Sequence, residues 1–312
     1  MTRLEDWLTW TLSPSISAIL VTLIFSLTLP ILIHTYLYKR AVAKELPTFL
    51  LLGPSGAGKT SLLTLVRPKH HPLLPLKDHT NIKQQLSNGT PSPTHTSQAP
   101  QTATCQLPST TRSSEDKYRS ENDTSSRTQP SILLLDTPGH GKLRHHAIAS
   151  LTSPTALKGL LFVVDSAVLS SAAGLTETAE YLYDVLLLLQ KRHTQGKTSK
   201  GPLAIPVLLV ANKQDVFTSL PAGLVKSKLE EELGKVRQTR SKGLLDSGIG
   251  MDDDGEADEE SNWLGEYGAK GFKFAQMREH GVEVEVVGMS TSAEGEDEGR
   301  VHECWGWIGA NV

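Results

Sequence analysis

The sequence predicts an α/β protein whose core is a doubly wound, mostly parallel sheet with helices on both faces. Short apolar runs of strand length alternate along the chain with longer segments of helical character, and this order of elements produces such sheets. The predicted strands are 46–52, 131–135, 159–164, 205–210 and 282–287, with 102–107 as an edge strand. The predicted helices are 59–66, 176–190, 224–240 and 301–308. The first run ends at a glycine-rich turn, which is typical of a buried parallel strand that leads into a helix.

A separate apolar segment precedes this domain. Residues 16–38 contain no acidic side chain, lysine or arginine. As a helix they would span roughly 34 Å, which is enough for a hydrocarbon core of about 30 Å. The alternative is a cleaved signal peptide, but a signal peptide carries its positive charges before the apolar run, whereas Lys39, Arg40 and Lys44 follow it here. We therefore predict a lumenal N-terminus at 1–15, one transmembrane helix at 16–38, a basic juxtamembrane linker at 39–45 and a cytosolic domain at 46–312.

Composition excludes several classes of function. The formal net charge of −3 gives no field that attracts nucleic acid, so direct nucleic-acid binding is not expected. The two cysteines, Cys105 and Cys304, support neither a disulfide framework nor a metal site. Two polar stretches, 109–130 and 241–262, are predicted to be disordered insertions in the domain.

The clearest motif follows the first predicted strand. Residues 53–60, Gly53-Pro54-Ser55-Gly56-Ala57-Gly58-Lys59-Thr60, match G-x-x-x-x-G-K-[ST] completely. In this pattern backbone amides surround a phosphate chain, the lysine reaches the β and γ phosphates, and the Thr60 hydroxyl coordinates Mg²⁺. The helix that starts at Lys59 directs its positive end at the same anion. Residues 53–60, with Ser61, are thus predicted to bind a nucleoside triphosphate and its Mg²⁺.

A second motif, Asn212-Lys213-Gln214-Asp215, follows the strand 205–210. The Asp215 carboxylate can accept hydrogen bonds from both the ring N–H and the exocyclic amine of guanine, which adenine cannot match. Lys213 can lie across the base, and Asn212 can brace the loop or approach the acceptor edge of the base. An ordinary Asn/Asp turn is the alternative, but its position after a phosphate-binding loop favours GTP and GDP as ligands.

A third motif, Asp136-Thr137-Pro138-Gly139-His140, follows the strand 131–135. Asp136 is placed to hold Mg²⁺ through a water molecule, and the Gly139 amide can meet a γ-phosphate, a contact whose loss on hydrolysis switches such loops. His140 stands where a residue that orients the attacking water is expected. Its alternative is a structural or solvent-exposed histidine, and both interpretations remain open.

Two further positions are less sharply defined by the sequence. Thr96, in the threonine-rich stretch before the edge strand, is our choice as the switch threonine for Mg²⁺. A loop that touches the guanine should follow the strand 282–287, where Ser290 and the pair Ser292-Ala293 both qualify. We assign Ser290 as a base contact and leave the second possibility open.

Taken together, these features resemble a known family. The N-terminal anchor, GPSGAGKT at 53–60, DTPGH at 136–140, VVDSA at 163–167 and NKQD at 212–215 are similar to those of the β subunits of the eukaryotic signal recognition particle receptor. Three more matching segments are 179–184, 229–240 and 271–274. The long insertion 109–130 and the absence of a clean Ser-Ala-Lys in 288–300 depart from that pattern.

The resemblance implies a small GTPase related to the ADP-ribosylation factors and anchored in the endoplasmic reticulum. In its GTP form such a protein would hold the receptor α subunit through that subunit's N-terminal domain, with Thr96 and 136–144 facing it. The protein would contact signal recognition particle and ribosome only indirectly, through the α subunit. A slow, possibly partner-stimulated GTPase is one version of this function, and a constitutively GTP-loaded docking subunit with negligible hydrolysis is the other. The remaining alternatives are another membrane-anchored ADP-ribosylation-factor-like GTPase, a membrane ATPase, and a P-loop scaffold that no longer binds nucleotide. The intact Lys59, Thr60, Asp136 and Asp215 argue against the last of these.

Overall fold

A computed structural model of the chain describes residues 19, 23–34, 46–66, 94–108, 111, 113–114, 130–152, 157–195, 204–246, 263–269, 271–291 and 298–312. The chain divides into two units, Met1–Glu45 and Leu46–Val312. Residues 23–34 of the first unit are helical. No helix within the described ranges combines the length and the apolar character needed to cross a bilayer. The predicted segments 1–15 and 39–45, and the rest of 16–38, lie outside the described residues.

The second unit is built on one sheet of six strands among the described residues, in the order β2-β3-β1-β4-β5-β6. The strands are β1 (Thr48–Leu52), β2 (Gln101–Gln106), β3 (Ser131–Asp136), β4 (Leu157–Asp165), β5 (Val207–Asn212) and β6 (Val284–Gly288). Neighbouring strands are parallel throughout, except that the edge strand β2 pairs with β3 in antiparallel register. The predicted doubly wound, mostly parallel sheet is therefore confirmed, including its edge strand.

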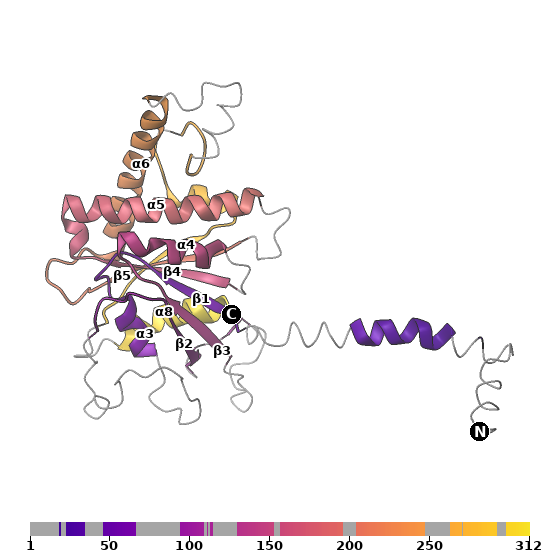
Figure 1. Ribbon diagram of the computed structural model, residues 1–312. Coiled ribbons are helices and arrows are strands. Elements are labelled where there is room, and N and C mark those ends of the chain that lie inside the picture. The colour runs from indigo at the N-terminus through magenta and orange to yellow at the C-terminus, as the bar shows by residue number, and fades with distance from the viewer. Residues whose placement is uncertain are drawn as a thin grey trace, which may run out of the picture. The chain divides into compact units, whose positions relative to one another are not determined.

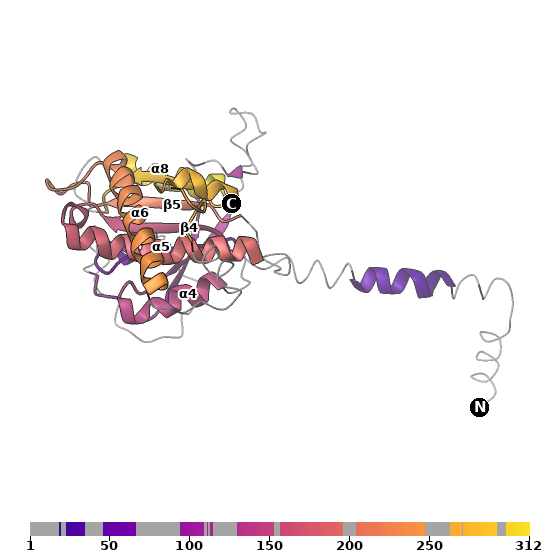
Figure 2. The same cartoon turned by 90° about the horizontal axis from the view of Figure 1, so that it is seen from above.

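Helices cover both faces of this sheet (Figures 1 and 2). One face carries α4 (Arg144–Thr152), α5 (Ala172–Gln195) and α6 (Ala222–Asp246), and the other carries α3 (Lys59–Val66) and α8 (Glu298–Ala310). Three 3-10 helices complete the described elements: η2 (Gly141–Leu143), η3 (Val168–Ser170) and η5 (Phe274–His280).

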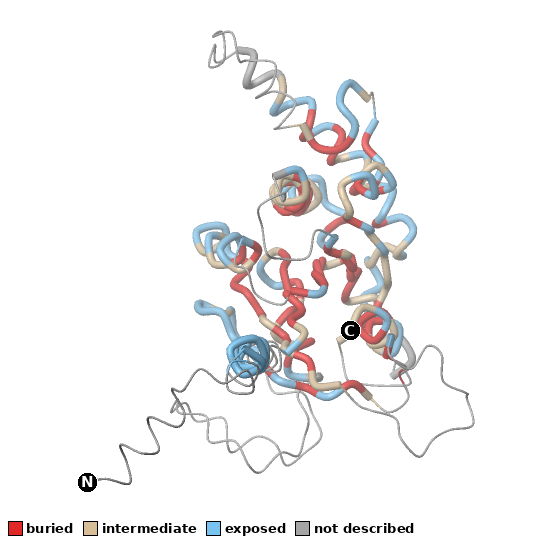
Figure 3. The backbone as a smooth tube through the Cα atoms, turned by 90° about the vertical axis from the view of Figure 1, so that its right-hand side faces the viewer, coloured by how far each residue is buried: buried red, intermediate tan, exposed pale blue. Residues whose placement is uncertain are grey.

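Side chains alternate between the two faces of the sheet along each strand, so the buried side chains form two cores. Figure 3 shows the buried residues of the backbone in red. In β1, Leu50 and Leu52 face the core under α4, α5 and α6, whereas Phe49 and Leu51 face the core under α3 and α8, because successive side chains of a strand point to opposite faces. In the second core Trp307 packs edge-on against Phe49, with ring centroids 6.1 Å apart. Both faces of the sheet are thus sealed by helices.

Both cysteines lie in this second core. Cys105 sits on β2 and Cys304 on α8, and both thiols are free and buried. Burial raises the pKa of each to about 12, because an apolar environment disfavours the thiolate. They therefore act as small apolar core residues.

The packing of the second core requires a glycine at position 159. A methyl group added there would lie 2.8 Å from the ring of Trp307 and 3.0 Å from that of Phe49. The absence of a side chain therefore lets the two aromatic rings approach β4 closely, which is the packing that isolated glycines in strands permit.

The predicted insertions need correction where the structure describes them. The helix α6 continues through residues 241–246, so the first part of the segment predicted as loop at 241–262 is helical. Near the start of 109–130, Thr111 and Ser113 are buried, and the Ser114 hydroxyl donates to the carbonyl of Val312 at 2.5 Å. The beginning of that insertion is therefore packed on the domain, and most of the remainder of both insertions falls outside the described residues.

The segment after the second insertion is held to α6 by one buried arginine. The guanidinium of Arg237 donates to the carbonyl oxygens of Leu264 at 3.1 Å and Ala269 at 2.5 Å. It also stacks on the ring of Trp263, 4.6 Å from the ring centroid. Burial lowers the pKa of Arg237, which is a cost that the two hydrogen bonds and the stacking offset.

Candidate functional site

All three sequence motifs lie at the same edge of the sheet. The phosphate-binding pattern follows β1, the 136–140 motif begins at the last residue of β3, and the 212–215 motif begins at the last residue of β5. These strands run parallel to one another in the sheet, so their carboxyl ends share an edge. Ligands of open α/β sheets bind outside this edge.

Two glycines allow the loop 53–58 to approach its neighbours. Gly53 has φ +136°, and a methyl group there would clash with the carbonyl of Val163 on β4. Gly58 has φ +94°, and a methyl group there would clash with the side-chain amide of Asn212. Positive φ values of this kind favour glycine, so the loop conformation depends on both residues. Between them, Ser55 and Gly56 are exposed and Ala57 is buried.

Lys59, the first residue of α3, is buried with its ammonium inside this loop. Its Nζ donates to the carbonyl oxygens of Gly53 and Pro54, each at 2.8 Å. Burial lowers the pKa of Lys59 to about 8, and the nearby carboxylate of Asp136 partly opposes that shift. The loop therefore surrounds a desolvated cation, and a phosphate chain there would supply the counter-charge that it lacks.

Thr60 and Asp136 join the first motif to the third. The Thr60 hydroxyl donates to Oδ2 of Asp136 at 2.7 Å, while Oδ1 of the same carboxylate is buried and has no hydrogen-bond partner. Desolvation raises the pKa of Asp136, and the Thr60 hydrogen bond and Lys59 oppose that rise.

This donor set fits Mg²⁺. The ion prefers oxygen ligands, keeps several waters, and takes one or two carboxylates together with substrate phosphates. A buried oxygen without a partner is the kind of group that a metal-bound water would satisfy. A hydroxyl and a carboxylate are in contact here, and within the described ranges no group of three or more His, Cys, Asp or Glu side chains forms a separate metal site.

The loop after Asp136 is anchored to β1 and lies against the phosphate-binding loop. The hydroxyl of Thr137 donates to the Leu51 carbonyl at 2.9 Å. A methyl group added to Gly139 would lie 2.5 Å from the Lys59 ammonium and 2.6 Å from the Gly53 carbonyl oxygen. Residue 139 therefore has to be a glycine for the third motif to reach this close to the first.

His140 is exposed and caps the short helix η2. Its Nδ1 accepts a hydrogen bond from the Lys142 amide at 3.3 Å. In the neutral ring this places the proton on Nε2, so the free nitrogen of His140 is a donor in this arrangement. The ring can orient a water molecule by donation, but it cannot take that water's proton while Nδ1 keeps its partner.

Arg144 ends this loop and fixes its position on α5. Its guanidinium stacks on the ring of Tyr181, 4.4 Å from the centroid, and forms an ion pair of 3.4 Å with Glu177. The Tyr181 side chain is buried, and burial raises its pKa to about 12. The predicted switch segment 136–144 is therefore held at one end by β1 and at the other end by α5.

A threonine other than the predicted switch threonine contacts α3. Thr96 is exposed, whereas the hydroxyl of Thr94 lies 3.2 Å from that of Ser61. Residues 67–93, which precede Thr94, lie outside the described residues. The stretch 94–100 contains neither helix nor strand.

Asn212 connects three parts of the site. Its amide nitrogen donates to the Ala57 carbonyl at 2.8 Å and to the Thr291 hydroxyl at 3.3 Å, and its Oδ1 accepts from the Thr291 amide at 3.1 Å. These contacts are those of a residue that braces the loop, which is one of the two roles predicted for Asn212. Thr291 was missed by the sequence reasoning, although it directly follows the assigned Ser290.

Ser290 and Asp215 are brought together by β6 and β5. The buried Ser290 hydroxyl donates to Oδ1 of the exposed Asp215 carboxylate. This contact places Ser290 beside the residue predicted to select the base. The alternative pair, Ser292-Ala293, lies outside the described residues.

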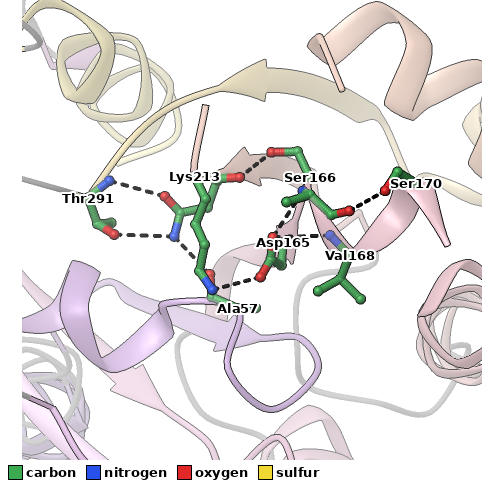
Figure 4. A network of polar contacts seen from close by, with 9 residues as sticks. Ala57, Asp165, Ser166, Val168, Ser170, Lys213 and Thr291 are labelled. Carbon is green, nitrogen blue, oxygen red and sulfur yellow. Dashed lines mark hydrogen bonds and ion pairs between the residues drawn. The ribbon is translucent and has the colours of Figure 1, made fainter. Parts of the chain in front are cut away.

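Lys213 adopts φ +63°, and no other described residue except glycine has a positive φ. Its ammonium forms an ion pair of 2.6 Å with Oδ2 of Asp165, the last residue of β4 (Figure 4). Asp165 belongs to the segment 163–167 that resembles the receptor β subunits, but the sequence reasoning assigned it no role. Its signal in the sequence was a carboxylate immediately after a buried strand at the ligand-binding edge.

The phosphate-binding loop, the buried Thr60–Asp136 contact and the β2-β3-β1-β4-β5-β6 sheet define a P-loop protein with the small-GTPase fold. Residues 44–282 match the sequence model of the family described as the signal recognition particle receptor beta subunit. The chain therefore belongs to the signal recognition particle receptor beta subunit family.

Individual relatives agree with this assignment. The signal recognition particle receptor subunit beta of Saccharomyces cerevisiae is 31% identical over 232 residues, which cover 74% of this chain and 73% of that protein. The SRb-GTP/SRX complex of the receptor from Chaetomium thermophilum is 38% identical with a TM-score of 0.62, covering 85% of this chain and all of that one. The SRb-GDP-Mg structure from the same organism is 35% identical with a TM-score of 0.56, covering 86% and 99%.

Proposed function

We propose that this chain is the membrane-anchored, GTP-binding subunit of a signal recognition particle receptor, and that its GTP form holds the receptor α subunit at the endoplasmic reticulum. The contact between Thr60 and Asp136 at 2.7 Å carries the proposal. It joins the phosphate-binding loop to the switch loop around a buried carboxylate oxygen that has no partner, as a Mg²⁺-dependent nucleotide switch requires.

The triphosphate would be held by the amides of 53–61 and by the Lys59 ammonium, with the Gly139 amide at the γ-phosphate. Thr60 would coordinate Mg²⁺ directly, Asp136 through water, and the switch threonine, assigned to Thr96, would complete the set. Support comes from the solved relatives, one a GTP complex and one a GDP–Mg complex. Bound Mg²⁺ supplies charge neutralisation of the phosphates, while the chain's own amides and lysine supply their orientation.

Guanine selectivity is assigned to Asp215, with Ser290 positioning its carboxylate, Lys213 lying across the base and Asn212 bracing the loop. Calorimetry with GTP, ATP and Mg²⁺ on the detergent-extracted chain tests this assignment. We expect GTP to bind and an excess of ATP to leave that binding unchanged. Equal competition by ATP would favour the membrane ATPase instead, although a single predicted transmembrane helix provides no pore for a transporter.

Hydrolysis is the part of the function on which the two versions differ. With its Nδ1 engaged by Lys142, His140 can orient water but is a poor base, so we propose slow turnover of GTP to GDP and phosphate. Single-turnover hydrolysis with and without the α-subunit N-terminal domain separates the versions. Stimulation by the partner that His140→Ala removes would support the slow GTPase, whereas negligible turnover in both conditions would identify a constitutively loaded docking subunit.

Partner binding is assigned to Thr96 and the switch segment 136–144, and membrane attachment to the predicted helix 16–38. The Chaetomium relative was solved in a complex with GTP and SRX, which supports a nucleotide-dependent partner. Through that partner, signal recognition particle and ribosomes would be reached indirectly.

Thr60→Asn tests GTP binding and α-subunit binding together. Losing the hydroxyl should weaken Mg²⁺-dependent GTP binding and release the α subunit in a pull-down from detergent extracts. Full retention of the partner at low GTP would contradict nucleotide control.

Fractionation of a variant that lacks residues 1–40 tests the anchor, because the truncated chain should leave the membrane fraction when the partner is absent.

A further inference from the structure

The ion pair between Asp165 and Lys213 lies where the two strands that lead to the predicted base site end together. Asp165 and Asn212 are register partners in the parallel pair of β4 and β5, and Lys213 is the next residue of the chain. The Lys213 side chain is 37% exposed and that of Asp165 is 12% exposed. Figure 4 shows the long lysine side chain reaching from the end of β5 to the carboxylate. The carboxylate is therefore shielded, whereas the lysine is partly exposed, so solvent weakens this pair less than a fully exposed surface pair.

The carboxylate is itself held in place by the backbone. Its Oδ1 accepts hydrogen bonds from the amides of Ala167 at 3.0 Å and Val168 at 3.3 Å, at the start of η3. This leaves Oδ2 for the lysine ammonium, at 2.6 Å. Because each oxygen has its own partners, Asp165 cannot follow Lys213 if the lysine moves, and it acts as a fixed attachment point.

The lysine backbone needs such an attachment. A φ of +63° is uncommon for a residue other than glycine and persists only where the surroundings hold it. The next residue is also fixed, since Gln214 Nε2 donates to the Leu220 carbonyl at 2.8 Å and to the Ser166 hydroxyl at 3.1 Å. Lys213 is therefore held at its backbone by the loop and at its ammonium by Asp165, with the aliphatic stem stretched between the two ends.

We propose that Asp165 is a positioning residue for the nucleotide base, acting through Lys213. The inference rests on the proposed guanine-nucleotide function and extends it. A stem fixed at both ends forms a flat apolar surface for the face of a purine ring, whichever groups the ring carries at its edge. Asp165 then controls how long any purine nucleotide stays bound, while the choice between purines remains with Asp215.

Dissociation of a fluorescent GDP and a fluorescent IDP from the full-length chain in detergent tests this division of roles. Asp165→Asn keeps an oxygen for the two amides but presents an amide nitrogen to the lysine, so the ion pair is lost. We expect dissociation of both nucleotides to accelerate on the order of tenfold, the usual scale for a charge-assisted hydrogen bond. The ratio between the GDP and IDP rates should not change.

Lys213→Met tests the pair from the other side, because it keeps the stem and removes the ammonium without disturbing the backbone contacts of Asp165. We expect it to reproduce the rate of Asp165→Asn. The double variant should be no faster than either single variant, since both remove the same interaction. Additive effects would mean that Asp165 acts only through η3, and would overturn the inference.

Asp184→Asn is the matched control. Asp184 forms an ion pair of the same length, 2.6 Å, with Arg240 between α5 and α6, away from the three motifs, and its variant should release nucleotide at the wild-type rate. If the wild-type chain binds no guanine nucleotide, the proposed function fails. If the wild type binds and both Asp165→Asn and Lys213→Met keep its dissociation rate, the proposed function stands and the positioning role is wrong.

Discussion

The buried ammonium of Lys59 makes a quantitative prediction about pH and stability. In the folded protein its pKa is lowered from 10.5 to about 8, chiefly by burial. A difference of this size means that the charged form of Lys59 disfavours the nucleotide-free fold by about 3 kcal/mol near neutral pH. The charge that the proposed phosphate binding requires therefore reduces the stability of the nucleotide-free protein.

The sign of the pH dependence follows from proton binding. Between about pH 8 and 10.5 the unfolded lysine stays protonated while the folded one loses its proton, so the unfolded state holds more protons and stability rises with pH. From pH 7 to pH 9.5 this one group should add about 2 kcal/mol to the free energy of unfolding. Below about pH 7 both states are protonated and its contribution stays constant.

Urea unfolding of wild type and Lys59→Met at the two pH values isolates this contribution. Methionine has a similar length and does not titrate, and other groups, including Cys105, Cys304 and Tyr181 with their raised pKa values, affect both proteins alike. The measurement uses chain lacking residues 1–40, with EDTA and without nucleotide. If the difference between the two proteins is the same at pH 7 and pH 9.5, Lys59 is not desolvated and the reasoning is refuted.

Three substitutions extend these expectations to other parts of the molecule. Gly139→Ala places a methyl group 2.5 Å from the Lys59 ammonium, so GTP affinity should fall at least about tenfold. If calorimetry gives the variant the same GTP affinity as the wild type, the switch loop does not approach the phosphate site. Asp215→Asn should shift preference from GTP toward xanthosine triphosphate, with roughly 100-fold weaker GTP binding, and an unchanged preference in competition assays would contradict the guanine assignment. Arg237→Met should lower the free energy of unfolding by about 3 kcal/mol without changing GTP affinity, and a matching loss of affinity would mean that the α6 contacts reach the site.

The four central strands β3, β1, β4 and β5 were predictable because they are nearly uniform apolar runs. β1 and β5 are buried along their whole length, and such strands stand out against polar loops. Helices with few apolar residues were harder to find. The helix α4 buries only Ala147 and Leu151, one turn apart. Its large apolar residue Ile148 is exposed, so the helix has too little periodicity to be recognised.

The site was predictable where a motif fixes both the residue type and the spacing. Lys59 and Thr60 start the helix after the turn that follows β1, and Asp136 and Asn212 are the last residues of β3 and β5, so each motif lies at the sheet edge that the spacing predicts. Asp165 was not assigned a role, because its importance depends on the register between β4 and β5, which joins residues distant in sequence. Hydrogen bonds across strands of this kind cannot be obtained from spacing alone.

The two buried thiols make this protein convenient for site-specific labelling. With pKa values of about 12, Cys105 and Cys304 would carry roughly one thiolate in 100,000 molecules at neutral pH, and neither is accessible to a maleimide dye. A single cysteine introduced at Phe217, which is fully exposed at 103% and lies two residues after the motif 212–215, would be the reactive group. A fluorophore there would report nucleotide exchange in a chain that keeps both native cysteines.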